Sequence, residues 1–162
     1  MKKYELTSET KVINGVELHR IKALDSFGNV KKGELGGWIE SEKNLSQDGN
    51  AWVYGNAKVR EYAWVCDNAK VYGHAKVFGH ATISGDATVG KTADFIVFKK
   101  WWSSGRFFTW TRSNNKWEVG CFYGSGEELI AKAYKDSEKS GREYERVVNY
   151  VESILKEENN NK

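Results

Sequence analysis

The stretch that decides the fold is NAWVYG-NAKVRE-YAWVCD-NAKVYG-HAKVFG-HATISG-DATVGK, residues 50–91. Each of these seven hexads has alanine at its second position and valine or isoleucine at its fourth. No α-helix repeats every six residues, and a hairpin strand repeats every two. A strict period of six, with one small and one β-branched inward residue, is typical of a β-solenoid in which each hexad forms one flat side of a triangular coil.

The period also predicts which residues of this hexad segment lie above one another. Three hexads make one coil, so residues 18 apart should stack, for example Lys58 over Lys76 and Trp64 over Thr82. The valines should point inward, and the alanines should fill the tight space beside the next coil. Glycine, asparagine, aspartate and histidine near the hexad boundaries allow the bends, because these types tolerate left-handed backbone conformations.

Residues 1–49 are predicted to be a β-rich N-terminal cap. Asn14-Gly15 lies between two apolar stretches and signals a two-residue hairpin turn, since both residues tolerate positive φ. The end of a solenoid exposes unpaired backbone groups and apolar core, which another segment has to cover. The repeat itself is predicted to occupy residues 50–93.

Residues 94–158 change character and are predicted to form a small α+β domain. Three strands of an antiparallel sheet are expected at residues 94–102, 106–112 and 116–122. Ser125 opens a helix with acidic residues in its first turn, and Gly141 is expected to end it. An apolar stripe from Tyr144 to Leu155 predicts a final helix, followed by a disordered tail at residues 159–162.

The hexads resemble the hexapeptide-repeat proteins, a mostly trimeric superfamily of left-handed parallel β-helices that includes many acyltransferases. A closer resemblance rests on KGELGGWIESEKNLS, residues 32–46, followed by GNAWV, residues 49–53. This run looks like the opening of hexapeptide-repeat proteins encoded by bacteriophages and prophages, which are labelled polymer-forming or transferase. The resemblance implies that the hexads form a short left-handed parallel β-helix. With the β-rich cap and the small α+β domain, a three-stranded antiparallel sheet and two helices, predicted from the residues, the expected fold class is mainly β.

Composition narrows the classes of function. The chain has 25 basic and 22 acidic residues, a balance that does not indicate nucleic-acid binding by itself. No apolar run approaches the roughly 20 residues of a membrane span, and the first residues lack a signal-peptide core. The cysteines Cys66 and Cys121 form no disulfide framework and no metal-binding spacing. We therefore expect a cytoplasmic protein, in the host cytoplasm if a phage encodes it, with no metal or cofactor and no membrane partner.

The resemblance to acyltransferases implies a histidine base at a subunit interface, with acyl-CoA bound along the repeat. His74 and His80 are the candidates, and each stands directly before alanine in its hexad. Asparagine or aspartate fills the same position in other hexads, so a turn-forming role explains the two histidines as well. The repeat is also short and has no protruding loop to enclose an acceptor. Acyl-CoA-dependent acyl transfer is therefore the alternative function.

The strand region is the stronger functional candidate. Residues 95–117 contain five basic residues and no acidic one, interleaved with eight aromatic residues. Strand alternation places Arg106, Phe108, Trp110 and Arg112 on one face. Such a face suits a nucleotide, a nucleic acid or an acidic protein partner, although the same rings could instead be core beneath the helices. The predicted binding residues are Lys99, Lys100, Trp101, Trp102, Arg106, Phe108, Trp110, Arg112 and Lys116.

Large rings at outward hexad positions predict self-association. They are too numerous to remain in water on a soluble monomer, and three-fold packing along the sides of the repeat would bury them. The predicted interface of a homotrimer consists of Trp52, Tyr54, Trp64, Tyr72 and Phe78.

These features predict a non-enzymatic, oligomeric binding protein that captures a macromolecular partner or an anionic ligand. The phage resemblance suggests a purpose for the capture: inhibition of a host defence system that targets nucleic acid, as anti-CRISPR proteins do.

Overall fold

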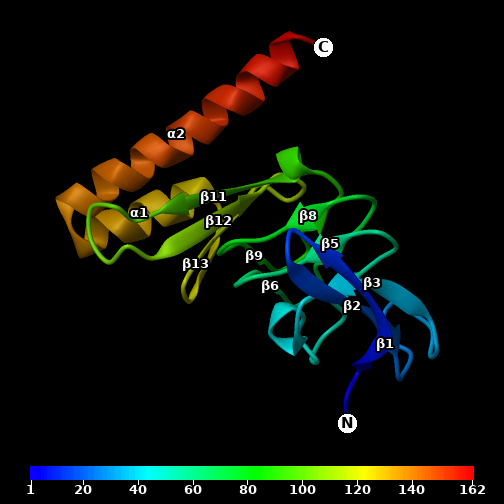
Figure 1. The fold of residues 1–162 in the computed structure, drawn as a ribbon. Coiled ribbons are helices and arrows are strands. Elements are labelled where there is room, and N and C mark those ends of the chain that lie inside the picture. The colour runs from blue at the N-terminus through cyan, green and yellow to red at the C-terminus, as the bar shows by residue number, and fades with distance from the viewer.

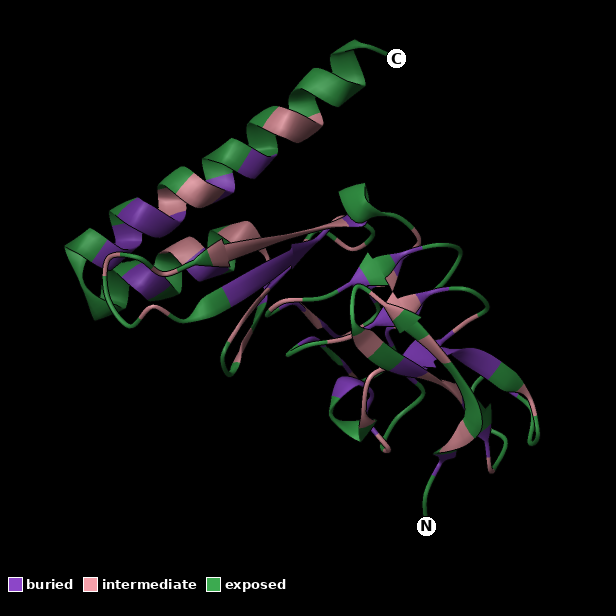
Figure 2. Ribbon diagram, viewed as in Figure 1, coloured by how far each residue is buried: buried purple, intermediate pink, exposed green.

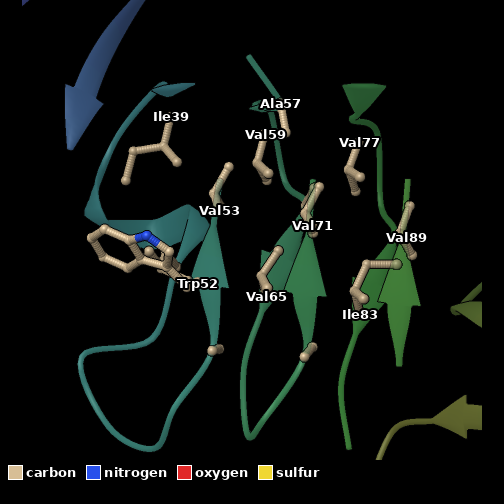
Figure 3. Close-up of a cluster of buried hydrophobic side chains, with 14 of the residues drawn as sticks. Ile39, Trp52, Val53, Ala57, Val59, Val65, Val71, Val77, Ile83 and Val89 are labelled. Atoms are coloured by element: carbon tan, nitrogen blue, oxygen red, sulfur yellow. The ribbon is translucent and has the colours of Figure 1, made fainter. Parts of the chain in front are cut away.

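The hexads form the inner part of the first half of the molecule. The computed structural model describes residues 1–162, and each hexad contributes one strand of two residues. These strands are β4 (Trp52–Val53), β5 (Lys58–Val59), β6 (Trp64–Val65), β7 (Lys70–Val71), β8 (Lys76–Val77), β9 (Thr82–Ile83) and β10 (Thr88–Val89). Every hexad alanine and every hexad valine or isoleucine is buried, with at most 1% of its surface exposed. Figure 3 shows the aliphatic side chains pointing toward one another.

The strands of the hexad segment pair in parallel with partners 18 residues along the chain. Lys58 pairs with Lys76, and Trp64 pairs with Thr82. The pairs divide over three separate sheets, because the chain bends after each strand. The spacing of 18 residues is therefore confirmed.

The N-terminal residues add an antiparallel hairpin to one of these sheets. Strands β1 (Tyr4–Ile13) and β2 (Val16–Ala23) are joined by the predicted turn, where φ is 51° at Asn14 and 81° at Gly15. Strand β3 (Leu35–Ile39) links the hairpin to the hexads, and the resulting five-stranded sheet has the order β1-β2-β3-β5-β8. A short 3-10 helix, η1 (Glu42–Asn44), follows β3. Lys3 covers the first hexad, since its Nζ donates to the carbonyl of Ala51 at 2.8 Å.

The second half of the chain contains a four-stranded antiparallel sheet and two helices. A 3-10 helix, η2 (Thr92–Asp94), leads into β11 (Phe95–Lys99), β12 (Phe107–Thr111), β13 (Lys116–Val119) and β14 (Phe122–Gly124), which pair in this order. Helices α1 (Gly126–Asp136) and α2 (Glu138–Asn160) follow. Ser137 separates the helices and caps α2, its Oγ accepting from the backbone N–H of Ser140 at 3.0 Å. The predicted break at Gly141 is wrong, because this residue lies within α2. Neither helix is long and apolar enough to cross a membrane.

The fold class predicted from the sequence is wrong. The structure is mixed: short strands distributed over several small sheets are combined with two helices, and no regular left-handed β-helix is evident. The hairpin at residues 4–23 continues a sheet of the hexad segment through β3. The C-terminal sheet has four strands rather than three, because Gly120, with φ of 57°, turns the chain back and Phe122 starts a further strand. Helix α2 also extends through Asn160, into the predicted tail.

The four-stranded sheet lies between the helices and the hexad segment (Figure 1). One face buries apolar side chains against α1 and α2, which are buried on their inner sides and exposed outside (Figure 2). The other face forms hydrogen bonds with the hexads. The backbone N–H of Thr82 donates to Thr109 Oγ1 at 3.0 Å, and the backbone N–H of Thr88 donates to Ser113 Oγ at 2.8 Å. Both faces of this sheet are thus covered.

A basic cleft as the candidate binding site

The predicted exposed face of β12 is buried. Phe108 and Trp110 share a face, as strand alternation predicted, but they pack among side chains of α1 and α2 and expose 1% and 0% of their surface. Of the two interpretations of these rings, their burial supports core beneath the helices and excludes a stacking surface for a ligand. Arg112, at the far end of the strand, forms an ion pair with Glu158 of α2.

The other predicted binding residues lie at both ends of the sheet. Lys116 pairs with Thr111 at the turn from β12 to β13. At the other end of the sheet, Lys99 ends β11, and the loop after it contains Lys100, Trp101 and Trp102. Lys99 and Trp101 are exposed, and Trp102 is half-buried. Trp102 packs edge-on against Tyr144 of α2 at a centroid distance of 5.0 Å. The structure therefore brings only part of the predicted set together, around Tyr144.

A cleft of about 490 Å³ opens beside Tyr144, between the sheet and α1. We call it the basic cleft. Its apolar lining comes from β13, β14 and α1, and three cationic side chains lie around it. The lining residues are Lys100, Arg106, Val119, Cys121, Phe122, Tyr123, Leu129, Lys132, Ala133, Asp136 and Tyr144.

Arg106 is held at the cleft by the backbone. The backbone N–H of Lys100 donates to the carbonyl of Arg106 at 2.8 Å, which closes the loop between β11 and β12. The guanidinium lies over Gly120, where an added Cβ would come within 2.2 Å of Arg106 Nη1. Glycine at residue 120 thus serves both the positive φ of the turn and the placement of this cation.

The charges around the cleft do not cancel. Arg106 and Lys100 have no carboxylate within 4.0 Å. Lys132 has one such neighbour, Asp136, at 3.8 Å, and both of these side chains are more than half exposed. Exposed ion pairs of this kind are weak, so the Lys132 ammonium remains available to another anion. Three cations and one carboxylate leave the site with a surplus of positive charge.

Tyr144 forms the inner wall of the cleft, and nearby charges change the pKa of its hydroxyl. Burial raises the pKa of its hydroxyl, while the nearby Arg106 guanidinium lowers it and Asp136 raises it further. The hydroxyl is therefore neutral at physiological pH, and it can donate a hydrogen bond to an anion. Lys100 Nζ lies 5.8 Å from the centroid of the same ring.

The two candidate histidines have different surroundings. His74 is exposed. His80 lies between Tyr62 and Phe107, with centroid distances of 4.8 Å and 4.1 Å and interplanar angles of 7° and 1°. Neither imidazole forms a hydrogen bond within the chain, so no side chain orients it as a general base. No group of three or more metal-ligating side chains is arranged to hold an ion.

The five side chains predicted to form an oligomer interface differ in exposure. Trp52, which was expected to face outward, is fully buried, because Tyr4 and Phe27 pack edge-on against its ring. Tyr54 is half-buried. The exposed fractions of the other three are 36% for Trp64, 46% for Tyr72 and 47% for Phe78.

Several residues of the basic cleft were not predicted as binding residues. Lys132 and Tyr144 come from helices whose sequences indicate only amphipathic packing. Cys121, which is exposed, also lines the cleft. The net basic character of residues 95–117 was the one signal in the sequence that pointed to this region.

The chain is similar to known proteins over only part of its length. No family model matches the chain. An uncharacterized acetyltransferase, YdcK of Escherichia coli strain K12, is 37% identical over 62 residues, which are 33% of this chain and 19% of that protein. The chain thus spans about a fifth of the length of the curated relative it matches. This similarity is consistent with the resemblance to the hexapeptide-repeat superfamily, over part of the chain.

Proposed function

We propose that the protein is a non-enzymatic binding protein that captures an anionic group in the basic cleft. The anion belongs either to a ligand or to an acidic macromolecular partner. The observation that carries the proposal is the convergence of Lys100, Arg106 and Lys132 on one apolar cleft with a single carboxylate beside it.

The residues that line the cleft support binding of a ligand rather than catalysis. Its apolar surface can bury the body of a ligand, and its cations and the Tyr144 hydroxyl can bind the charged part, a division that is common in ligand sites. Arginine is suited to carboxylate and phosphate because its planar group donates two parallel hydrogen bonds. The cleft contains no histidine, and its one thiol, Cys121, forms no side-chain hydrogen bond to a base.

Binding of 8-anilinonaphthalene-1-sulfonate tests the proposal, since this probe combines a sulfonate with an aromatic body. We expect saturable fluorescence enhancement by the folded protein. Arg106→Glu and Lys132→Glu should each weaken binding by roughly tenfold, as expected for loss of a charge-assisted contact worth about 1.5–3 kcal/mol. The measurement is a fluorescence titration, with circular dichroism to show that each variant is folded.

Lys135→Glu is the matched control. Lys135 lies on α1 one turn from Lys132, is exposed, and does not line the cleft. Equal affinity of the wild type, Arg106→Glu and Lys132→Glu, or an equal loss in Lys135→Glu, would refute the assignment of the cleft.

The alternative function is acyl transfer from acyl-CoA along the hexads, and the similarity to an acetyltransferase supports it. His80 would be the base, or His74. Acetyl-CoA binding measured by calorimetry, together with its loss in His80→Ala or His74→Ala, would favour this alternative over the binding protein. The cleft variants should leave such binding unchanged.

The setting suggested by the phage resemblance remains a prediction. In that setting a homotrimer presents three clefts to a component of a host defence system that targets nucleic acid. A pull-down from host lysate with the wild type and Arg106→Glu compares the partners that each retains.

A further inference from the structure

A second basic surface lies on the five-stranded sheet, away from the basic cleft. It follows one cross-strand row through β2, β3, β5 and β8, which are neighbours in the sheet (Figure 1). Arg20 pairs with Trp38, Trp38 pairs with Lys58, and Lys58 pairs with Lys76. All four side chains point outward, since Ile39, one residue beyond Trp38, faces the core.

A fourth cation joins this row from β1. Lys11 Nζ lies 3.9 Å from the centroid of the Trp38 ring, and the Arg20 guanidinium lies 5.8 Å from it. We call Lys11, Arg20, Lys58 and Lys76 the basic row. Adjacent strands are about 4.8 Å apart, so the strands that carry these four positive charges, from β1 to β8, span roughly 19 Å.

The charges of the row are largely uncompensated within the chain. Arg20 has a carboxylate neighbour, Glu9, at 3.6 Å. No carboxylate oxygen lies within 4.0 Å of Nζ of Lys11, Lys58 or Lys76. Like charges on directly opposite residues destabilise a sheet. Burial lowers the pKa of Lys58, and repulsion from Lys11 and Lys76 lowers it further.

The one ring within the row is covered, and the exposed ring of Phe78 lies beyond its end, two residues after Lys76. Trp38 exposes only 5% of its surface, because the basic side chains cover it. A protein partner is usually anchored by an exposed aromatic or apolar side chain at the centre of the interface. The phosphate backbone of a nucleic acid needs no such anchor, since regularly spaced anions and released counterions supply the affinity.

We propose that the basic row binds the phosphate backbone of a nucleic acid without reading its sequence. A line of cations that crosses the sheet from β1 to β8 suits a linear polyanion, and the covered Trp38 ring offers no surface within the row on which a base could stack. An acidic protein surface is the competing partner, and the test separates the two.

Fluorescence anisotropy with a labelled short duplex DNA of arbitrary sequence tests this proposal. The affinity should fall with salt between about 50 and 200 mM, with a slope of log K against log salt near −3 for three unpaired cations. Lys58→Gln with Lys76→Gln should reduce the magnitude of that slope by about two and weaken binding at least about tenfold at the lower salt concentration.

Lys70→Gln provides the matched control. Lys70 occupies the same hexad position as Lys58 and Lys76 but lies on β7 of another sheet, so its loss should change the slope much less. Arg106→Glu, in the cleft, should bind the duplex as the wild type does. The two proposals can therefore fail separately.

The outcomes that would overturn the proposal are equally specific. They are no binding of the duplex at low salt, an equal loss of affinity in Lys70→Gln and in the Lys58/Lys76 double variant, or displacement of the duplex by polyglutamate at lower concentration than by unlabelled duplex. The last result would assign the row to an acidic protein.

Discussion

Cys66 and Cys121 have different surroundings. Burial raises the pKa of the Cys66 thiol to about 12, and the carboxylates of Asp67 and Glu118 add to the rise. Cys121 is exposed and lines the basic cleft. Because the thiolate is the reactive form of cysteine, the two residues should differ in reactivity.

We expect iodoacetamide to modify Cys121 and to react with Cys66 at least about tenfold more slowly in the folded protein near pH 8. Peptide mapping by mass spectrometry measures the two rates. Cys121→Ser should remove most of the labelling, and denaturant should expose Cys66. Equal rates in the folded protein would contradict the assigned environments.

Single residues also show where prediction from the sequence stops. The hexad period and strand alternation predict correctly which side chains share a face, as for Phe108 with Trp110. They do not predict what covers that face. Trp52 is buried by Tyr4 and Phe27, which are distant in sequence, and no local pattern connects them.

Among the elements, β13 contains a carboxyl group whose protonation should affect stability. Glu118 faces the hexads and accepts a hydrogen bond from Ser84 Oγ at 3.1 Å. Burial raises the pKa of Glu118, the Ser84 hydrogen bond lowers it, and Asp67 raises it again, with a net upward shift. The folded state therefore binds this proton more tightly than the unfolded state does. The stabilisation is complete below the unfolded pKa of about 4.3 and is lost as the pH rises through the folded pKa.

Glu118→Gln tests this linkage, since glutamine keeps an acceptor for Ser84 but does not ionise. We expect the melting temperature of the variant, relative to the wild type, to rise by about 1–3 °C from pH 4 to pH 7. Thermal unfolding followed by circular dichroism at both values measures the difference. A difference that stays constant or falls with pH would show that the carboxyl is not destabilised by burial.

The elements differ in how far the sequence predicts them. The strands of the hexads follow from period six, and the hairpin at Asn14 follows from turn chemistry. The addition of the N-terminal hairpin to the sheet that contains β5 and β8, and the packing of the C-terminal sheet on the hexads, are specified by no local period. Ser137 rather than Gly141 separates the helices, because the serine can cap α2, while Gly141 lies where a side chain would come within 2.3 Å of the Tyr134 ring.

At the scale of the molecule, the exposed rings still predict self-association. Tyr72 and Phe78 lie at corners of the hexad segment and are nearly half exposed. Sedimentation equilibrium should give a mass near three times the 18.5 kDa of one chain. Tyr72→Glu with Phe78→Glu should shift the distribution toward the monomer by placing charges in the contact. A wild-type monomer at micromolar concentration would contradict the trimer.

The basic cleft is likewise a property of the whole chain. It requires the loop before β12, the turn at Gly120 and one face of α1 to meet at Tyr144. The sequence indicates a surplus of basic residues among the strands, but the meeting of three elements depends on how the helices pack. For this reason Arg106 was predicted and Lys132 was not.

The contacts between the last hexads and the C-terminal sheet have a consequence for aggregation. The N–H groups of Thr82 and Thr88, on the final strands, are bonded to Thr109 and Ser113. An unpaired strand edge can recruit strands from other copies and extend into a fibre. With these donors occupied, β9 and β10 cannot recruit a strand from another copy through Thr82 or Thr88, which leaves β8 as the last hexad strand with an unpaired edge at this end.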